Sequence, residues 1–307
     1  MKTRDLAIAL LVVIIWGANF TVIRLGLNGV PPLLLVALRF FLAAFPAVLL
    51  IKRPEIKLSY LLLYGFSVGI GQFVCLFYAI HIGMPAGVAS VVLQSQAFFT
   101  MLFAAVLLGE SVTVRQLAGL VVAASGLYLV AGGSFSSSTI PFGALLLTLS
   151  GAAFWGISNI VVRKATLAAA AQGKKINMLS LVVWSSLVPP VPLLLCSLLL
   201  DSPAAVLHTV THLTTLSLFS IAYLAFGATI LGYGLWSYLL GKYPANRVAP
   251  LSLLIPVAGI ITAQLVLAEH LVLRQWTGCL LVVFGLLLAF FTLPAVRSYR
   301  DFLSPRR

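Results

Sequence analysis

The chain has 307 residues, of which 62% are hydrophobic and 8% are charged, and its formal net charge is +13. Soluble globular domains are about 45–50% apolar and about 25% charged, so the composition excludes a soluble fold and indicates a membrane protein. The 19 Lys and Arg residues are scattered through short segments. This pattern favours a basic face against anionic lipid and argues against a nucleic-acid partner.

Long apolar segments separated by short polar breaks predict an all-α polytopic protein with ten transmembrane helices, because about 20 apolar residues cross a bilayer. The first segment follows Met1–Asp5, stays uncharged from Leu6 to Ile23 and lacks a small-residue cleavage site, so it is expected to be retained. The expected spans lie near residues 5–27, 31–51, 58–80, 85–108, 112–131, 141–163, 178–200, 216–239, 246–268 and 273–293.

The sequence from the fourth span onward recurs later in the chain. Each residue of the second set lies 159 positions (244 − 85) after its counterpart in the first. The pairs are Pro85 and Pro244, Ala86 and Ala245, Glu110 and Glu269, Arg115 and Arg274, Gln116 and Gln275, Gly119 and Gly278, and Gly126 and Gly285. Seven matches at one offset predict an internal repeat.

A polar break that begins at Gly132 divides the chain into two halves of five helices each. Because five is an odd number, the second half enters the membrane from the opposite side, which predicts two inverted five-helix repeats. The expected divisions are a first repeat over 1–131, an external linker over 132–140, a second repeat over 141–293 and a basic cytoplasmic tail over 294–307.

The distribution of Lys and Arg orients this arrangement. With the N-terminus inside, sixteen of the 19 basic residues fall in inside loops and tails, Arg24 and Arg274 fall outside, and Arg39 lies within a span. The positive-inside rule therefore predicts that both termini are cytoplasmic.

Two tryptophan motifs occupy corresponding places in the first and sixth spans, Trp16 before Asn19 and Trp155 before Asn159. Each Trp lies eight residues from a basic residue. That depth is roughly 12 Å, further in than the interfacial belt where Trp is enriched. Two interpretations stay open, packing against the adjacent glycine or lining of a cavity, and the symmetry between the two motifs favours the cavity.

Amide side chains interrupt the third and fourth spans at Gln72, Gln94 and Gln96. Polar groups in hydrocarbon need partners, and either interhelical hydrogen bonding or substrate binding would supply them. Gln72 follows a run of glycines in the third span, and Trp236 follows a similar run in the eighth. The glycines are expected to permit close helix approach, while Gln72 and Trp236 join the candidate cavity residues.

The ninth span differs from the fourth in carrying two prolines, Pro250 and Pro256. A proline inside a helix removes a backbone donor and clashes with the preceding turn, and the freed carbonyls need partners in protein or in a water-filled cavity. Broken helices at paired positions of inverted repeats point to a midplane site. Spans four and nine are therefore predicted to act as the gating pair.

No carboxylate lies in the middle of a span. The six acidic residues stand at or beyond the span ends: Asp5, Glu55, Glu110, Asp201, Glu269 and Asp301. The spans also hold no Ser/His/Asp set, no paired carboxylates and no His/Cys cluster. The sequence therefore predicts no catalytic residue, no metal site and no cofactor.

Arg39 is the exception to the lack of charge, since it lies eight residues past Pro31 in the second span. A guanidinium at this depth costs at least about 2.5–3.5 kcal/mol on insertion scales, and no intramembrane carboxylate offsets that cost. One interpretation is that Arg39 reaches toward the outer surface or binds backbone carbonyls at a helix end. The other is that it faces the cavity and pairs with a substrate carboxylate.

The segments Trp16–Phe20, Gly83–Ser90, Leu93–Phe99, Tyr223–Phe226, Gly232–Gly234 and Arg247–Leu254 resemble the EamA-type exporters of the drug/metabolite transporter superfamily, and the resemblance covers nearly the whole chain. It implies two inverted EamA domains around a central cavity in a bacterial inner membrane. It also implies export of small amino-acid-type metabolites, cysteine-pathway compounds such as O-acetylserine and cysteine. The candidate substrate-binding residues are Trp16, Asn19, Arg39, Gln72, Gln94, Gln96, Trp155, Asn159 and Trp236.

Two other functions stay open. A multidrug exporter of the same superfamily is the nearer one, but a cationic substrate favours a buried acid and this chain has a buried arginine instead. A polytopic lipid-modifying enzyme is expected to show aspartate-rich metal motifs, and no two acids lie close together in the sequence. The expectation is therefore a transporter and not an enzyme, with an amino-acid-like solute and the lipid bilayer as partners and with an open oligomeric state.

Overall fold

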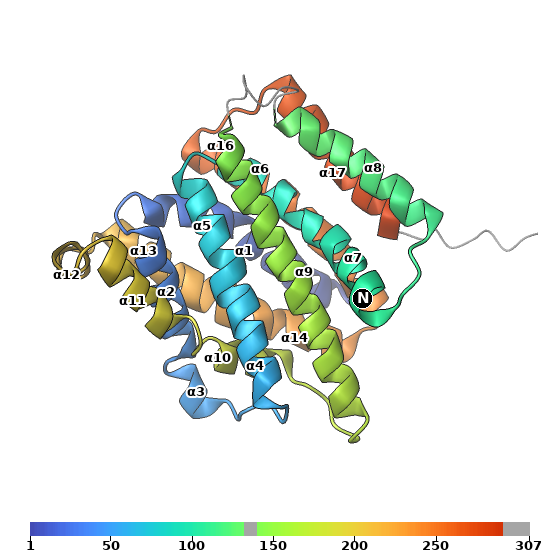
Figure 1. The fold of residues 1–307 in the computed structure, drawn as a ribbon, viewed down its shortest axis with the longest axis horizontal. Helices are drawn as coiled ribbons and strands as arrows, with labels where there is room; N and C mark the ends of the chain where they lie inside the picture. Colours follow the sequence, from blue (N-terminus) through green and yellow to red (C-terminus); the bar gives the residue numbers. More distant parts are fainter. Residues whose placement is uncertain (132–139, 291–307) are drawn as a thin grey trace, which may run out of the picture.

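A computed structural model describes residues 1–131 and 140–290, and every regular element in those ranges is helical (Figure 1). Most of the expected linker over 132–140, the end of the tenth span and the expected tail over 294–307 lie outside the described residues. The first half contains α1 Thr3–Leu27, α2 Pro32–Ala44, α3 Ala47–Leu50, α4 Leu58–Tyr64, the π-helix η1 Gly65–Gln72, α5 Phe73–His81, α6 Ala86–Val92, the 3₁₀ turn η2 Leu93–Ser95, α7 Gln96–Leu108 and α8 Val114–Val130.

The second half follows a similar order, with one additional short helix, α12, that was not expected. Its elements are α9 Phe142–Ala170, α10 Met178–Ser185, α11 Pro190–Leu200, α12 Pro203–Thr211, α13 Thr215–Ala222, the π-helix η3 Tyr223–Leu231, α14 Gly232–Lys242, α15 Ala245–Val248, the 3₁₀ segment η4 Ala249–Leu254, α16 Ile255–Leu267 and α17 Leu273–Phe290.

Eight helical segments in the described part of the chain are long and apolar enough to cross a membrane. They are Thr3–Leu27, Pro32–Leu50, Leu58–His81, Ala86–Leu108, Phe142–Ala170, Met178–Leu200, Thr215–Lys242 and Leu273–Phe290. The expected spans 112–131 and 246–268 correspond to the shorter apolar helices Val114–Val130 and Leu251–Leu267. The all-helical membrane class is confirmed, whereas a count of ten crossings stays a prediction.

The fourth and ninth spans are both interrupted near their middles. The 3₁₀ turn Leu93–Ser95 contains no proline, and it ends 159 positions (254 − 95) before the end of η4. Pro250 lies in η4, but Pro256 stands in the first turn of α16, where a missing N–H costs little. The ring of a proline clashes with the carbonyl four residues before it, here that of Ser252 inside η4, so the break lies where Pro256 is expected to disturb the span. The role of the two prolines in gating stays a prediction.

The last helices of the two halves pack side by side in opposite directions, as α8 and α17 in Figure 1. Four glycines allow this contact, since a Cβ at Gly119 would lie 2.5 Å from the carbonyl oxygen of Gly285, and one at Gly126 would lie 2.6 Å from that of Gly278. Each glycine contact is the repeat-related copy of the other. The glycines that recur in the repeat therefore provide the small-residue contact between these two helices.

The first helix of each half packs against the other half. A Cβ at Gly17 of α1 would lie 2.5 Å from Cβ of Ala258 in α16. A Cβ at Gly156 of α9 would lie 2.9 Å from Cβ of Phe99 in α7. Ala258 and Phe99 are again 159 positions apart (258 − 99). The two halves therefore interlock through equivalent contacts, and the space between them belongs to both.

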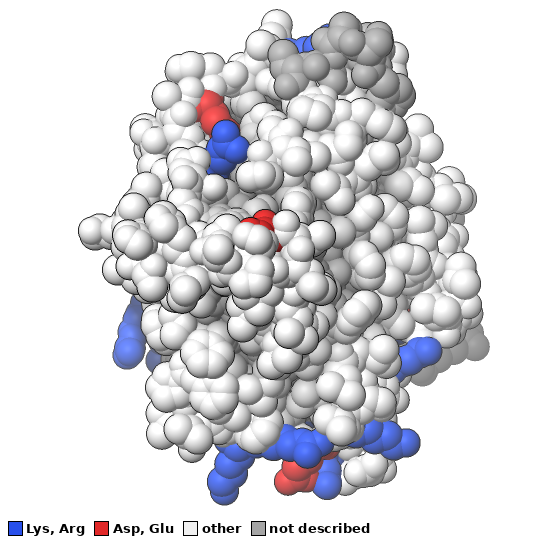
Figure 2. Space-filling view, turned by 60° about the vertical axis from the view of Figure 1, so that its left-hand side comes forward, with Lys and Arg blue, Asp and Glu red and all other residues white. Residues whose placement is uncertain are grey.

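Charged side chains distinguish the two ends of the bundle. Lys and Arg gather along the lower edge in Figure 2, the end at which α4 begins and α9 ends in Figure 1. The loops there hold the exposed residues Lys52, Arg53, Lys57, Lys174 and Lys175. The opposite, upper end carries the turn from α5 to α6 and the turn from α16 to α17.

Candidate functional site

A cavity of about 330 Å³ lies between the two halves, near the middle of the long helices. It is lined by Trp16, Asn19, Phe20, Arg39, Tyr64, Gln72, Phe73, Leu76, Leu93, Gln94, Gln96, Trp155, Asn159, Val162, Met178, Ala228, Tyr233, Trp236, Ser237, Leu240, Ser252 and Ile255. Val162, Met178 and Leu240 lie near the helix ends that carry the basic loops, so the cavity extends toward the lower end of the bundle.

All nine residues singled out from the sequence as substrate-binding candidates line this cavity. The structure adds members that sequence reasoning did not select, among them Tyr64, Phe73, Tyr233 and Ser252. Tyr233 stands in the Gly232–Gly234 motif and could have been chosen on that ground. Nothing marks the other three in the sequence, because an aromatic or hydroxyl residue in an apolar span is unremarkable until its neighbours are known.

Arg39 is buried, with 2% of its surface exposed, and it carries the only charge among the described residues that line the cavity. Its Nη2 donates to Oγ1 of Thr229 at 3.2 Å, and its guanidinium carbon lies 4.0 Å from the ring centre of Phe73. Nε and Nη1 have no hydrogen-bond partner. The residue thus neither reaches the outer surface nor binds a helix-end carbonyl. Two buried donors on a cation remain available, which is costly unless an anion occupies the cavity.

Of the five amide side chains that line the cavity, four fall into two groups, and the fifth, Gln94, is buried beside them. Asn159 Nδ2 donates to Oε1 of Gln96 at 2.8 Å and to Oγ1 of Thr100 at 3.0 Å, so this pair makes the interhelical bond that was one of the two interpretations. In contrast, Oδ1 of Asn19 and Oε1 of Gln72 are buried and have no partner. These two oxygens are therefore free acceptors in the wall of the cavity.

Aromatic rings form one side of the cavity. The ring of Trp16 lies 5.2 Å from that of Tyr233 and 5.3 Å from that of Trp236, centre to centre. Nε1 of Trp16 donates to the carbonyl oxygen of Ala228 at 2.9 Å, next to the Thr229 that binds Arg39. Gly17 provides the close helix contact and Trp16 lines the cavity, so the geometry contains both features, and a role of Trp16 in substrate binding stays a prediction.

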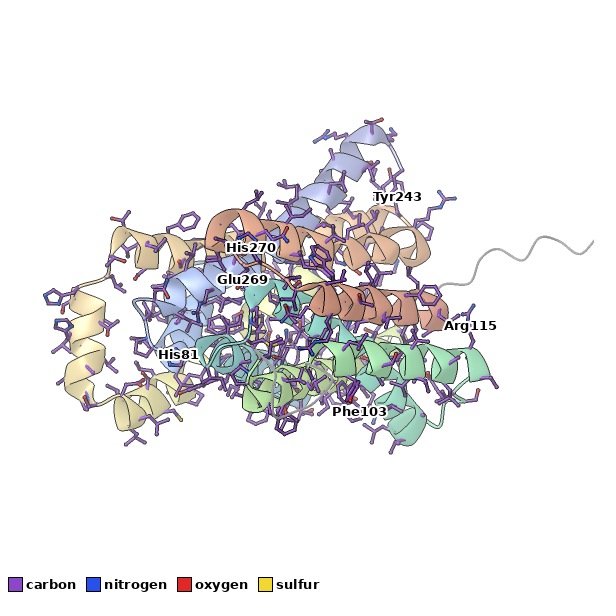
Figure 3. All side chains as sticks on the ribbon, turned by 90° about the horizontal axis from the view of Figure 1, so that it is seen from above. His81, Phe103, Arg115, Tyr243, Glu269 and His270 are labelled. Carbon is purple, nitrogen blue, oxygen red and sulfur yellow. The ribbon has the colours of Figure 1, made fainter. Side chains whose placement is uncertain are left out.

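At the upper end, the start of the fourth span is tied to the end of the ninth. Glu269, labelled in Figure 3 between α16 and α17, accepts hydrogen bonds from the backbone N–H groups of Ala86 at 2.8 Å and Gly87 at 3.0 Å. Deeper along the same contact, Oγ of Ser90 lies 3.4 Å from the carbonyl oxygen of Pro256. A carboxylate on the first N–H groups of a helix is a favourable arrangement.

At the lower end the corresponding carboxylate makes a different contact. Glu110, the repeat counterpart of Glu269, pairs with Arg163 of α9 and not with the start of α15. The lower half of the fourth span, α7, packs against α9. The two repeats are thus alike in sequence but differ in how their gating segments are paired.

Two further ion pairs hold the lower end together. Asp5 of α1 accepts from Lys242 at 2.9 Å and from Tyr243 at 2.6 Å. In the loops, Lys174 lies 2.7 Å from Glu55, and its hydrogen bond lowers the pKa of the Glu55 carboxyl. Each pair connects the two halves of the chain, and none of its members is among the described residues that line the cavity.

The chemistry of the cavity is that of binding. In the part of the chain that the structure describes, no three His, Cys, Asp or Glu side chains gather in a way that could hold a metal ion. One buried cation, several uncommitted amide groups and a wall of aromatic rings suit a small polar solute that carries a negative group. Together with the apolar helices, this arrangement defines the class, a multi-pass membrane transporter.

The comparison with known protein families also indicates a transporter. The sequence model of the EamA-like transporter family matches residues 4–132 and 142–291, and the chain belongs to that family. It is a transporter and not an enzyme. The two matched segments correspond closely to the halves predicted from the internal repeat, so the two-repeat architecture of the family fits this chain.

The similarity to known proteins extends over almost the full length of this chain. The probable amino-acid metabolite efflux pump of Escherichia coli (strain K12) is 43% identical over 293 residues, 95% of this chain and 97% of the relative. The pump of that name from Salmonella typhimurium is 44% identical over 300 residues, 98% and 99% of the two chains. The uncharacterized inner membrane transporter YedA of Escherichia coli is 26% identical over 286 residues, 90% and 87%. The apolar helices and these relatives indicate a multi-pass inner-membrane protein.

A solved crystal structure supports the fold. Its chain is 18% identical to this one and superposes with a TM-score of 0.62, covering 97% of this chain and 100% of its own. At 18% identity the structural similarity supports the helical fold and gives no information on function.

Proposed function

We propose that this protein exports small amino-acid-type metabolites across the inner membrane, cysteine-pathway compounds such as O-acetylserine and cysteine, by alternating access. The observation that carries the proposal is Arg39, a buried cation with two free donors in a cavity shared by both halves. A substrate carboxylate can accept both donors in a charge-assisted pair. Two relatives at 43% and 44% identity are named probable amino-acid metabolite efflux pumps, which supports this substrate class.

The same observation disfavours a multidrug exporter. Cationic drugs bind best where a carboxylate or an aromatic cage faces them, and a fixed guanidinium in the same cavity repels them. No Asp or Glu is among the described residues that line the cavity. Aromatic rings alone do not offset the repulsion, because a desolvated cation–π contact contributes roughly 2 kcal/mol.

The fold is proposed to contain ten transmembrane helices in two inverted five-helix repeats, with both termini cytoplasmic. Antiparallel packing of α8 on α17 supports inversion, because equivalent helices of parallel repeats would run in the same direction. The lower end carries the basic loops and corresponds to the cytoplasmic face. On this orientation the cavity extends toward the cytoplasm, the side from which an exporter collects its substrate.

Alternating access is proposed to depend on movement of spans four and nine, the gating pair. The ninth span contains Pro250 and Pro256. The external ends of the two spans are joined by Glu269 on the N–H groups of Ala86 and Gly87. Inverted symmetry implies a second state in which Glu110 leaves Arg163 and joins the N–H groups at the start of α15. The 3₁₀ breaks in both spans provide a place where the two ends of a span can move separately.

Transport by vesicles tests the proposed function. Everted membrane vesicles containing the protein should accumulate radiolabelled cysteine, under reducing conditions, and O-acetylserine, compared with vesicles that lack it. Cationic drugs should neither accumulate nor compete. Accumulation of the drugs with no transport of either amino acid would favour the multidrug reading.

A further inference from the structure

Two free acceptors stand in the same cavity wall as the free donors of Arg39. Oδ1 of Asn19 and Oε1 of Gln72 are buried without a partner, in side chains that are 7% and 4% exposed. A buried acceptor left unpaired costs about 1–3 kcal/mol, so both oxygens favour an occupant that can donate to them. Such an occupant has to combine donors with the anionic group that Arg39 requires.

Asn19, Gln72 and Arg39 line the same cavity, and neighbours of both amides in the fold contact Arg39. Gln72 directly precedes Phe73, whose ring lies 4.0 Å from the guanidinium carbon of Arg39. On the other side, Thr229 binds Arg39 at 3.2 Å and follows Ala228, whose carbonyl accepts from Trp16 at 2.9 Å. Asn19 lies one helical turn from Trp16 on the same face of α1.

A third feature suits a cation. The ring of Trp16 lies 5.2 Å from that of Tyr233 and 5.3 Å from that of Trp236, centre to centre, and all three residues line the cavity. Aromatic faces attract an ammonium group, while amide oxygens accept its three N–H donors without adding a charge. A carboxylate in this position would instead pair with Arg39 and close the site to an anion.

We propose that Asn19 and Gln72 form an ammonium subsite, so that the cavity binds the zwitterion of an α-amino acid, with its carboxylate on Arg39 and its ammonium on the two amide oxygens. This inference rests on the proposed function and specifies its substrate class. It excludes N-acylated amino acids, which lack the ammonium, and amino esters, which lack the carboxylate. Neutral amides in place of an acid let one small cavity hold both charges of the substrate.

Competition assays test the carboxylate contact and the ammonium contact separately. Uptake of radiolabelled cysteine into everted vesicles is measured with increasing amounts of unlabelled cysteine, N-acetylcysteine or cysteine methyl ester. Wild-type protein should prefer cysteine to each analogue by about tenfold or more, since a hydrogen bond to a charged group contributes about 1.5–3 kcal/mol. Asn19→Leu and Gln72→Leu should reduce the preference over N-acetylcysteine to about twofold and keep the preference over the ester.

Three other variants complete the test. Arg39→Gln should do the opposite, and because its cysteine uptake is expected to be very low, it is assayed with radiolabelled cysteine methyl ester. Unlabelled cysteine should then compete no better than the unlabelled ester, and N-acetylcysteine should compete less well than either. Gln172→Leu is the control, because this amide is exposed in the loop after α9 and does not line the cavity, and it should leave both ratios unchanged. Asn19→Asp keeps the side-chain shape but adds a carboxylate that can pair with Arg39, so it should reduce the preference for cysteine over the cationic ester, which has no carboxylate of its own. Each ratio is measured within one variant and so does not depend on the amount of folded protein.

The outcomes distinguish this inference from the proposed function. Wild-type vesicles that do not take up cysteine or O-acetylserine overturn the proposed function and this inference with it. If the wild-type vesicles take up cysteine but N-acetylcysteine competes as well as unlabelled cysteine does, the ammonium subsite is wrong and the proposed function stands. Unchanged ratios in both Asn19→Leu and Gln72→Leu lead to the same conclusion.

Discussion

Loss of the Glu269 carboxylate should open the external side of the cavity. In the structure its two oxygens accept from Ala86 and Gly87 at 2.8 and 3.0 Å, and these bonds join the external ends of the two gating spans. Hydrogen bonds to a charged group contribute about 1.5–3 kcal/mol each. Ala86 and Gly87 are buried, but Glu269 is only partly buried, so removal of its side chain leaves room for water to bind the freed N–H groups. We therefore expect a net loss of roughly 1.5–3 kcal/mol in Glu269→Ala, hence about a 10- to 150-fold shift toward the outward-open state.

Side-specific labelling measures that shift. A single cysteine is placed at Ser237, which lines the cavity, in a background with Cys75, Cys196 and Cys279 replaced by Ala. A membrane-impermeant maleimide is then added to right-side-out or to everted vesicles. Glu269→Ala should increase the labelling rate from outside at least several-fold and reduce the rate from inside.

Two other carboxylates serve as comparisons. Glu110→Ala should decrease labelling from outside, because its carboxylate is proposed to join the internal ends in the outward-open state. Glu55→Ala removes an exposed carboxylate paired with Lys174 and should change neither rate. Equal labelling from outside in Glu269→Ala and its parent, with both proteins inserted normally, would refute the reasoning. An increase in the rate of labelling from outside in Glu110→Ala would also refute it.

Three further predictions follow from the cavity, the prolines and the topology. Arg39→Gln should lower cysteine export about 30-fold or more, since loss of a buried charged pair costs about 2–5 kcal/mol or more, and should spare any transport of cysteine methyl ester; equal loss for both compounds would indicate that Arg39 has only a structural role. Pro256→Ala, alone or with Pro250→Ala, should slow transport while the protein still inserts; transport at the parental rate in all variants would remove the prolines from the gate. A reporter fused after Ser136 should lie outside and one fused after Gln172 inside, and the reverse pattern would contradict the inverted topology.

The candidate site was predictable because its residues conflict with their surroundings. An arginine, an asparagine or a glutamine in an apolar span is expensive, and a cavity is the usual reason for its presence. Arg39, Asn19 and Gln72 were selected on that ground, and all line the cavity. The repeat was predictable because glycines and turn residues recur at one offset, and the glycine contacts between α8 and α17 are its structural consequence.

Other features had no such signal. Thr229, the hydrogen-bond partner of Arg39, is 190 positions away and is an ordinary residue for an apolar helix. Glu269 looked like any acid beyond a helix end, and only the fold brings it to the start of the fourth span. The break at Leu93–Ser95 contains neither glycine nor proline, so local sequence preference cannot account for it. These features depend on contacts between distant segments, which a single sequence does not display.

Cysteine uptake into proteoliposomes that contain only this purified protein tests the central claim most directly. Wild-type protein should give saturable uptake that unlabelled cysteine inhibits, and Arg39→Gln, reconstituted in equal amount, should give uptake close to that of empty liposomes. Equal uptake by the two proteins, or none by the wild type when cysteine and O-acetylserine are both supplied, would contradict the account.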